Sequence, residues 1–113
     1  MSTWRKVLFV AAIVAAVGEA LDSISVGWVG LVFAALFALG AVLVARGGRA
    51  GVILVGVLML VEVVFWPFYP RESAADWIIQ TAFLILGLIG VVAACVTLWE
   101  SRRAEAPPVH ETG

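Results

Sequence analysis

The sequence of 113 residues has little of what most catalytic and metal-binding sites use. It holds one cysteine, one histidine and only 13% charged residues. One cysteine excludes an internal disulfide and a multi-cysteine metal site, and we expect Cys95 to be a small core residue. The single histidine, His110, lies in a polar C-terminal stretch, so no Ser–His–acid or Cys–His site can form within the apolar part of the chain. We therefore expect no catalytic residues, no metal site and no cofactor.

An excess of charge of one sign is also missing. Seven basic residues stand against eight acidic ones, for a net charge of −1, which gives no reason to expect a nucleic acid as partner. The sequence has neither a phosphate-binding loop nor a glycine-rich nucleotide turn. The sequence thus predicts a protein that is neither an enzyme nor a nucleic-acid-binding protein.

What the sequence does have is apolar length. Hydrophobic residues make up 64% of it, and its mean hydropathy is +1.13. A membrane span needs about 20 apolar residues in a helix, and helices of soluble proteins would show a polar stripe. Four runs meet this requirement, at about 4–22, 25–45, 51–66 and 75–99. We predict an all-α membrane protein, a bundle of four transmembrane helices in which short connections make neighbours antiparallel.

The predicted transmembrane domain covers residues 1–100. Residues 101–113 carry charges and two prolines and are expected to form a disordered cytoplasmic tail. An alternative concerns the N-terminus, where "WRK", an apolar run and "GEA" also fit a signal peptide cleaved after Ala20. The three further spans that follow closely favour an uncleaved first span.

Basic residues predict the orientation, because they gather on the cytoplasmic side of membrane proteins. Arg71 alone lies on one side of the four spans, and the other six basic residues lie on the opposite side: Arg5, Lys6, Arg46, Arg49, Arg102 and Arg103. Both termini are therefore expected in the cytoplasm. The preference for arginine over lysine, with much alanine, valine and glycine, is typical of a GC-rich bacterial genome, so we expect the bacterial inner (plasma) membrane.

Tryptophans support the same boundaries, because indole rings favour the membrane–water interface. Five residues are expected to anchor the helices in the lipid bilayer: Trp4 and Trp99 at the inner boundary, and Trp28, Trp66 and Trp77 at the outer one. No tryptophan falls in the middle of a span.

The loop before the fourth span has its own signals. Pro67 and Pro70 lack an amide hydrogen and predict the end of the third helix near Trp66. Ser73 and Asp76 resemble a capping box at the start of the fourth helix. Arg71 is expected to fold back towards the intramembrane glutamates or to meet lipid phosphate.

Glutamates inside two of the spans suggest a polar cluster. Glu62 precedes Trp66 by four residues and so lies about 6 Å below the outer boundary. Glu19 lies at a similar depth, and the predicted cluster in this layer comprises Glu19, Asp22, Glu62, Gln80 and Thr81. Two interpretations stay open. The carboxylates could bind a proton or a cation, or Glu62 could form hydrogen bonds to Gln80, Thr81 or water that fix helix register.

The two halves of the chain resemble each other. Glu19, Trp28 and Gly40 would correspond to Glu62, Trp77 and Gly90, as in a tandem repeat of two-helix units. The alternative is that any two membrane hairpins look alike, because tryptophan favours boundaries anyway.

The size, the four spans and the "GEA" around Glu19 resemble the small multidrug resistance transporters. The later part lacks that family's proline and "AYAxW"-type pattern, and the charge bias is stronger than is typical of it, so we do not infer membership. The leading prediction is an accessory or structural subunit that packs with other membrane proteins or with itself. The alternative is a small proton- or cation-coupled transporter using Glu62 and Glu19. It would have to be oligomeric, because four helices hardly enclose an aqueous path.

Overall fold

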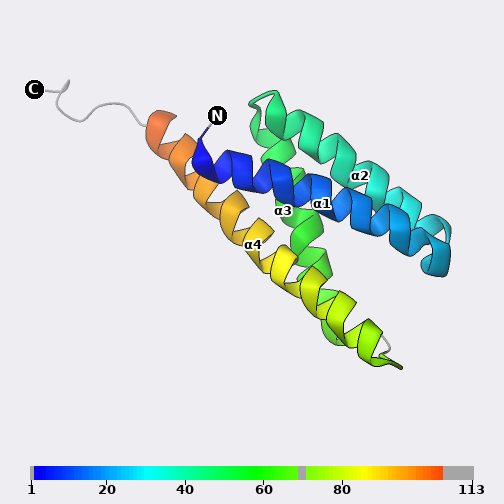
Figure 1. The fold of residues 1–113 in the computed structure, drawn as a ribbon. Helices are drawn as coiled ribbons and strands as arrows, with labels where there is room; N and C mark the ends of the chain where they lie inside the picture. Colours follow the sequence, from blue (N-terminus) through cyan, green and yellow to red (C-terminus); the bar gives the residue numbers. More distant parts are fainter. Residues whose placement is uncertain (1, 69–70, 106–113) are drawn as a thin grey trace, which may run out of the picture.

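The structure is a computed structural model that describes residues 2–68 and 71–105 (Figure 1). These residues form four α-helices and one short 3-10 helix, and the described residues contain no strand. The helices are α1 (Thr3–Val26), α2 (Trp28–Ala45), α3 (Arg49–Phe65) and α4 (Ala74–Glu105), and the 3-10 helix η1 covers Trp66–Phe68. All four α-helices are long and apolar enough to cross a membrane. The predicted all-α class with four candidate membrane spans is thereby confirmed.

The first turn lies later than the sequence predicts. The expected break between 22 and 25 is wrong, because α1 continues to Val26 and only Gly27 separates it from α2. Gly27 has φ +85°, and its N–H donates to the Ser23 carbonyl at 2.8 Å. A positive φ is easily adopted only by glycine, so this residue determines where the helix ends.

The fourth helix is longer than expected. It continues to Glu105, so residues 101–105, which the sequence assigns to the tail, are helical. The rest of the expected tail, residues 106–113, lies outside the described residues. Cys95 on this helix is exposed, so its expected place in the core is wrong. At the start of α4 the predicted cap by Ser73 is confirmed, since Ser73 Oγ accepts from Asp76 N at 3.2 Å. Asp76 Oδ2 accepts from Glu72 N at 3.1 Å, one residue before the Ser73 N–H that a complete capping box would use.

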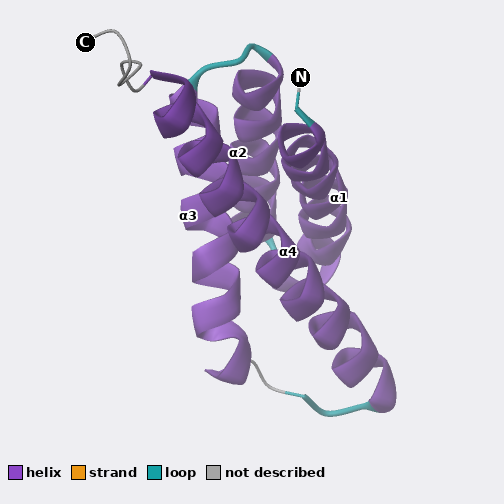
Figure 2. Cartoon of the chain, turned by 90° about the vertical axis from the view of Figure 1, so that its left-hand side faces the viewer, coloured by secondary structure: helices purple, strands orange, loops and turns teal. Residues whose placement is uncertain are grey.

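The helices pack as two pairs. α1 packs along α2 and α3 packs along α4, and the pairs join through contacts of α1 with α4 and of α2 with α3. Figure 1 shows the pairs close together where α1 begins and diverging away from that end. We call this the Arg5 end and the opposite one the Trp66 end. A second view shows α3 and α4 also separating from each other towards their connection (Figure 2).

The hydrophobic core lies towards the Arg5 end. Its largest fully buried side chains come from α1, α2 and α3: Leu8, Phe37, Val44, Val52, Val55 and Met59. Glycines allow the helices to approach closely. A Cβ on Gly51 would lie 2.5 Å from Val44 N, and a Cβ on Gly90 would lie 2.6 Å from Met59 Cγ. The core is thus made by close backbone approach as well as by side-chain burial.

Arg5 ties the first pair together at this end. Its Nη1 donates to the Val44 carbonyl at 2.9 Å and to the Gly48 carbonyl at 3.4 Å. The last carbonyls of a helix have no partner within the helix and carry partial negative charge. The guanidinium therefore satisfies the end of α2 while it holds the start of α1 beside it. Ser2 Oγ caps α1 by accepting from Arg5 N at 3.2 Å.

Candidate functional site

Two carboxyl groups meet inside the bundle, Glu19 of α1 and Glu62 of α3. Their carboxyl groups lie close enough to interact with each other, although α1 and α3 pack against each other very little elsewhere. Glu19 is only 8% exposed, and Glu62 is half-buried. The structure therefore brings together two of the predicted cluster residues directly, which the sequence placed only in the same layer.

The carboxyl pair, Glu19 and Glu62, lies at the edge of the core. Towards the Trp66 end, no described side chain beyond Glu19 in α1 or beyond Met59 in α3 is buried. On the α4 side of this layer Gly87 is buried, and a Cβ on Gly87 would lie 3.8 Å from Glu62 Cβ. The pair thus stands where the tightly packed half of the bundle gives way to the diverging half.

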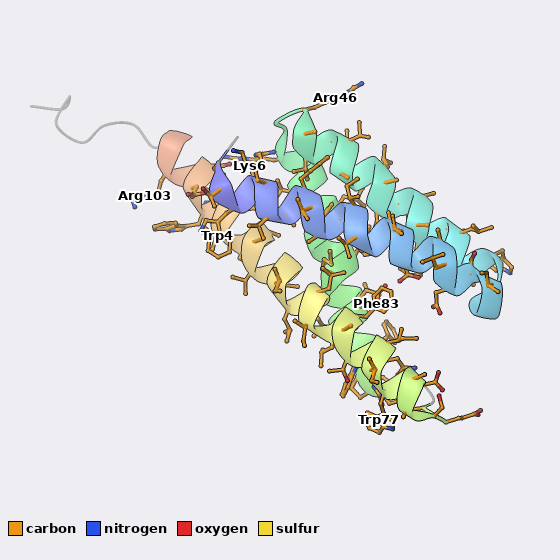
Figure 3. All side chains as sticks on the ribbon, viewed as in Figure 1. Trp4, Lys6, Arg46, Trp77, Phe83 and Arg103 are labelled. Atoms are coloured by element: carbon orange, nitrogen blue, oxygen red, sulfur yellow. The ribbon has the colours of Figure 1, made fainter. Side chains whose placement is uncertain are left out.

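At the level of the carboxyl pair, Phe83 of α4 packs against Gly18 of α1. Phe83 points from α4 towards α1 (Figure 3), and a Cβ on Gly18 would lie 2.6 Å from its Cζ. Gly18 directly precedes Glu19, so the missing side chain at this position gives the ring its place next to the carboxyl pair. This contact joins the two helix pairs at the level of the acids.

The other predicted cluster residues lie around the pair to different degrees. Asp22 is half-buried and close enough to Glu19 to act on it electrostatically. Gln80 is half-buried, and its backbone carbonyl accepts from Trp66 Nε1 at 2.9 Å. Thr81 is exposed. The structure thus places Asp22 with the pair, Gln80 nearer the Trp66 end, and Thr81 on the outside of α4.

Arg71 forms a stacked arrangement that the sequence did not predict. Its guanidinium Cζ lies 3.9 Å from the centre of the Trp66 ring and 4.8 Å from that of Trp77. Its Nη2 donates to the Trp66 carbonyl. Arg71 therefore lies against two rings instead of folding back to one of the intramembrane glutamates; the other expected contact, with lipid phosphate, stays a prediction. The spacing of Trp66, Arg71 and Trp77 around a proline turn was the available signal.

The tryptophans fall into two kinds. Trp4, Trp28, Trp77 and Trp99 are exposed, and Figure 3 places Trp4 at the Arg5 end and Trp77 at the other. Trp66 differs because it is half-buried and its indole N–H is bound by Gln80 within the protein. Four of the predicted anchors are thus available to an interface, while Trp66 serves mainly to hold α3 against α4.

The remaining chemistry of the described residues is sparse. They contain no group of three or more histidine, cysteine, aspartate or glutamate side chains that could hold a metal ion. No protein-family model matches the chain, and comparisons with curated proteins and with solved structures find no significant match. The carboxyl pair and the surfaces of the bundle are therefore the features that could carry a function.

Proposed function

We propose that the chain is a multi-pass protein of the bacterial inner membrane that serves as an accessory or structural subunit, packing with other membrane proteins or with itself. In this proposal neighbouring spans are antiparallel and both termini lie in the cytoplasm. The six-to-one distribution of basic residues supports that orientation. It puts the Arg5 end inside and the carboxyl pair towards the outer leaflet.

One observation supports the accessory role: the described core has no row of buried polar side chains along which an ion could cross the bundle. Among the described residues the only buried polar side chains are those of Glu19 and Thr97. Thr97 is already satisfied, because its Oγ1 donates to the Ala93 carbonyl at 2.7 Å. Between the carboxyl pair and the Arg5 end the buried side chains are otherwise apolar. Such a core favours packing over transport by a single chain.

The outer face of α2 suits a partner helix. The small residues of α2 form a run along the helix: Gly30, Ala34, Ala38, Ala41 and Ala45. Ala38 and Ala45 are exposed, whereas Gly30 and Ala41 are buried within the bundle. Small side chains let a second transmembrane helix approach closely, which is how helices associate in lipid. A cysteine at Ala38, in a Cys95→Ala background, should therefore cross-link to a partner or to a second copy. A cysteine at Leu60, which is also exposed, serves as the control on a bulky face.

The carboxyl pair supports a second candidate, a proton- or cation-coupled transporter that is oligomeric. Two ionised carboxylates in contact repel each other, and sharing one proton or binding a cation relieves that repulsion. Carboxyl groups inside membrane spans often mark ion pathways. An oligomer would have to supply the polar route that the core of one chain lacks.

Substitution of Glu62 separates the two candidates. Glu62→Gln keeps the shape and an acceptor for Glu19 but loses the exchangeable proton, so under the accessory role it should leave stability and partner binding nearly unchanged. Glu62→Leu leaves Glu19 without this partner and should cost about 1–3 kcal/mol, as is typical of a buried polar group left unsatisfied. Exposed Glu100 provides the matched control, Glu100→Gln. Unfolding in detergent and co-purification of a partner at fixed stoichiometry measure both effects.

A flux measurement completes the test. Wild-type protein reconstituted into liposomes with a pH or sodium gradient should not dissipate the gradient faster than empty liposomes. Dissipation that Glu62→Gln abolishes while the protein stays folded would reject the accessory role in favour of transport. If Glu62→Leu were as stable and as well associated as wild type, the carboxyl pair would have no packing role.

A further inference from the structure

An open apolar groove of about 380 Å³ runs between α1 and α4 near the Arg5 end. One wall is α1, from residue 3 to residue 14, and Leu86 and Ile89 of α4 contribute to the other. α1 and α4 are in contact with each other, and residues of both line the groove, so it is a depression on the surface where they meet. In a membrane this surface faces lipid.

The length of the groove matches one leaflet. From residue 3 to residue 14 the helix rises about 16 Å, which is roughly half of the ~30 Å hydrocarbon core. Its deeper lining is entirely apolar, with Val7, Val10 and Val14 on the α1 side. An extended acyl chain has the shape and polarity that this lining would accept.

Charge is concentrated at one mouth of the groove. Among the described lining residues, Thr3 and Lys6 carry polar groups and both lie in the first turn of α1; they line the groove with their apolar atoms, so the hydroxyl and the ammonium are not part of the lining itself. Lys6 is exposed, and Figure 3 places both Lys6 and Trp4 at the Arg5 end of the bundle. An ammonium and a hydroxyl at the boundary of a leaflet are suited to the phosphate of a lipid headgroup. Among the described residues that line the groove, none is acidic and would repel it.

We propose that this groove is a binding site for one anionic phospholipid, with an acyl chain between α1 and α4 and the headgroup phosphate held by Lys6 and Thr3. The apolar lining favours a lipid over free phosphate, because free phosphate has no apolar chain that could fill the groove. The site is separate from the carboxyl pair and does not depend on the accessory role proposed above.

Native mass spectrometry of the detergent-purified protein tests the site, with dioleoyl phosphatidylglycerol as probe and dioleoyl phosphatidylcholine as the neutral control. One phosphatidylglycerol should bind more tightly than phosphatidylcholine. Lys6→Gln should weaken it about fivefold, the factor expected for one basic residue near an anionic headgroup. Arg46→Gln is the matched control, because Arg46 is exposed at the end of α2 and does not line the groove (Figure 3); it should leave binding unchanged.

A second variant tests the apolar part independently of charge. Val10→Trp places a large ring in the groove and should abolish tight binding of phosphatidylglycerol, whereas Val57→Trp, on an exposed face of α3, should not. Excess inorganic phosphate should fail to displace the lipid. Equal binding of the two lipids, wild-type binding by both Lys6→Gln and Val10→Trp, displacement by phosphate, or occupation of the groove by a second protein chain would each overturn the proposal. Circular dichroism confirms that every variant remains helical.

Discussion

The close approach of α2 and α3 at Gly51 offers a sharp test of the packing. A Cβ on Gly51 would lie 2.5 Å from Val44 N and 2.6 Å from the carbonyl carbon of Leu43. These are backbone atoms within α2, so they cannot rotate aside as the end of a side chain can. Gly51→Ala therefore requires α2 and α3 to separate. By contrast, a Cβ on Gly48 would meet nothing within 4 Å, and its φ of −80° suits alanine.

The size of the effect follows from this geometry. Ordinary contact at a Cβ begins at 3.4 Å, so the helices must move apart by about 1 Å. Overpacking of this kind costs about 1–3 kcal/mol, against a gain of up to about 1 kcal/mol when alanine replaces glycine in a helix. We expect a net loss of about 1–2 kcal/mol in the free energy of unfolding. The hydrogen bond from Arg5 to the Val44 carbonyl lies at the same crossing and would be strained by the same movement.

A series of three variants makes the test specific. Gly18→Ala should be intermediate, because the atom that a new Cβ would meet at 2.6 Å belongs to the Phe83 ring, which can turn. Titration of folded protein in mixed micelles with a denaturing detergent, followed by circular dichroism, gives the free energy of unfolding for each. We expect stability to rise in the order Gly51→Ala, Gly18→Ala, Gly48→Ala. If Gly51→Ala were as stable as Gly48→Ala, the close contact of α2 with α3 would be refuted.

Two further predictions concern the ends of the bundle. In a Cys95→Ala background, a cysteine at Ser73 should react with an impermeant thiol reagent added outside the cell and a cysteine at Ser101 should not; the reverse labelling would contradict the proposed orientation. Arg71→Gln removes the stacking on Trp66 and Trp77. It should lower the free energy of unfolding by about 1–2 kcal/mol, from roughly 0.5–1 kcal/mol for each cation–π contact. Arg71→Lys should recover part of this loss, and unchanged unfolding and tryptophan emission in Arg71→Gln would show that the stack does not stabilise the loop.

The four spans could be predicted because membrane insertion depends on local properties, length and apolarity. Their boundaries depend on backbone conformation, which hydropathy does not report. Gly27 shows this clearly: the apolar run falls off before it, yet the helix continues until this glycine adopts a positive φ. At the start of α4 the prediction succeeded because the capping signal of Ser73 and Asp76 is itself local.

The partners of charged residues could be predicted less well. Depth along a helix follows from residue number, so the sequence placed Glu19 and Glu62 in one layer. Which side chains then meet depends on how the helices are arranged around each other, and the contact between these two glutamates needed that arrangement. Arg71 had carboxylates and aromatic rings within reach along the sequence. In the structure Arg71 lies against the rings of Trp66 and Trp77.

A tandem repeat, which the sequence suggests, would account for the least expected feature, two acidic side chains in contact. When α1 is aligned with α3 so that Glu19 matches Glu62, core-facing positions coincide: Leu8, Ala12 and Ala15 match Gly51, Val55 and Leu58, all of them buried. In α2 and α4, aligning Gly40 with Gly90 also aligns Phe33 with Phe83, although Trp77 then falls one residue before the position of Trp28.

The contacts between the pairs follow the same relation, since exchanging the two halves converts the packing of α1 on α4 into that of α3 on α2. In any arrangement related by a two-fold axis, a side chain close to the axis meets its own equivalent. Under the suggested repeat, Glu19 and Glu62 would be such equivalents. A single ancestral carboxylate near the axis would therefore produce the pair without separate selection for two acids. Repulsion between them would then be relieved by a shared proton or cation, or by the divergence of the helix pairs beyond this layer.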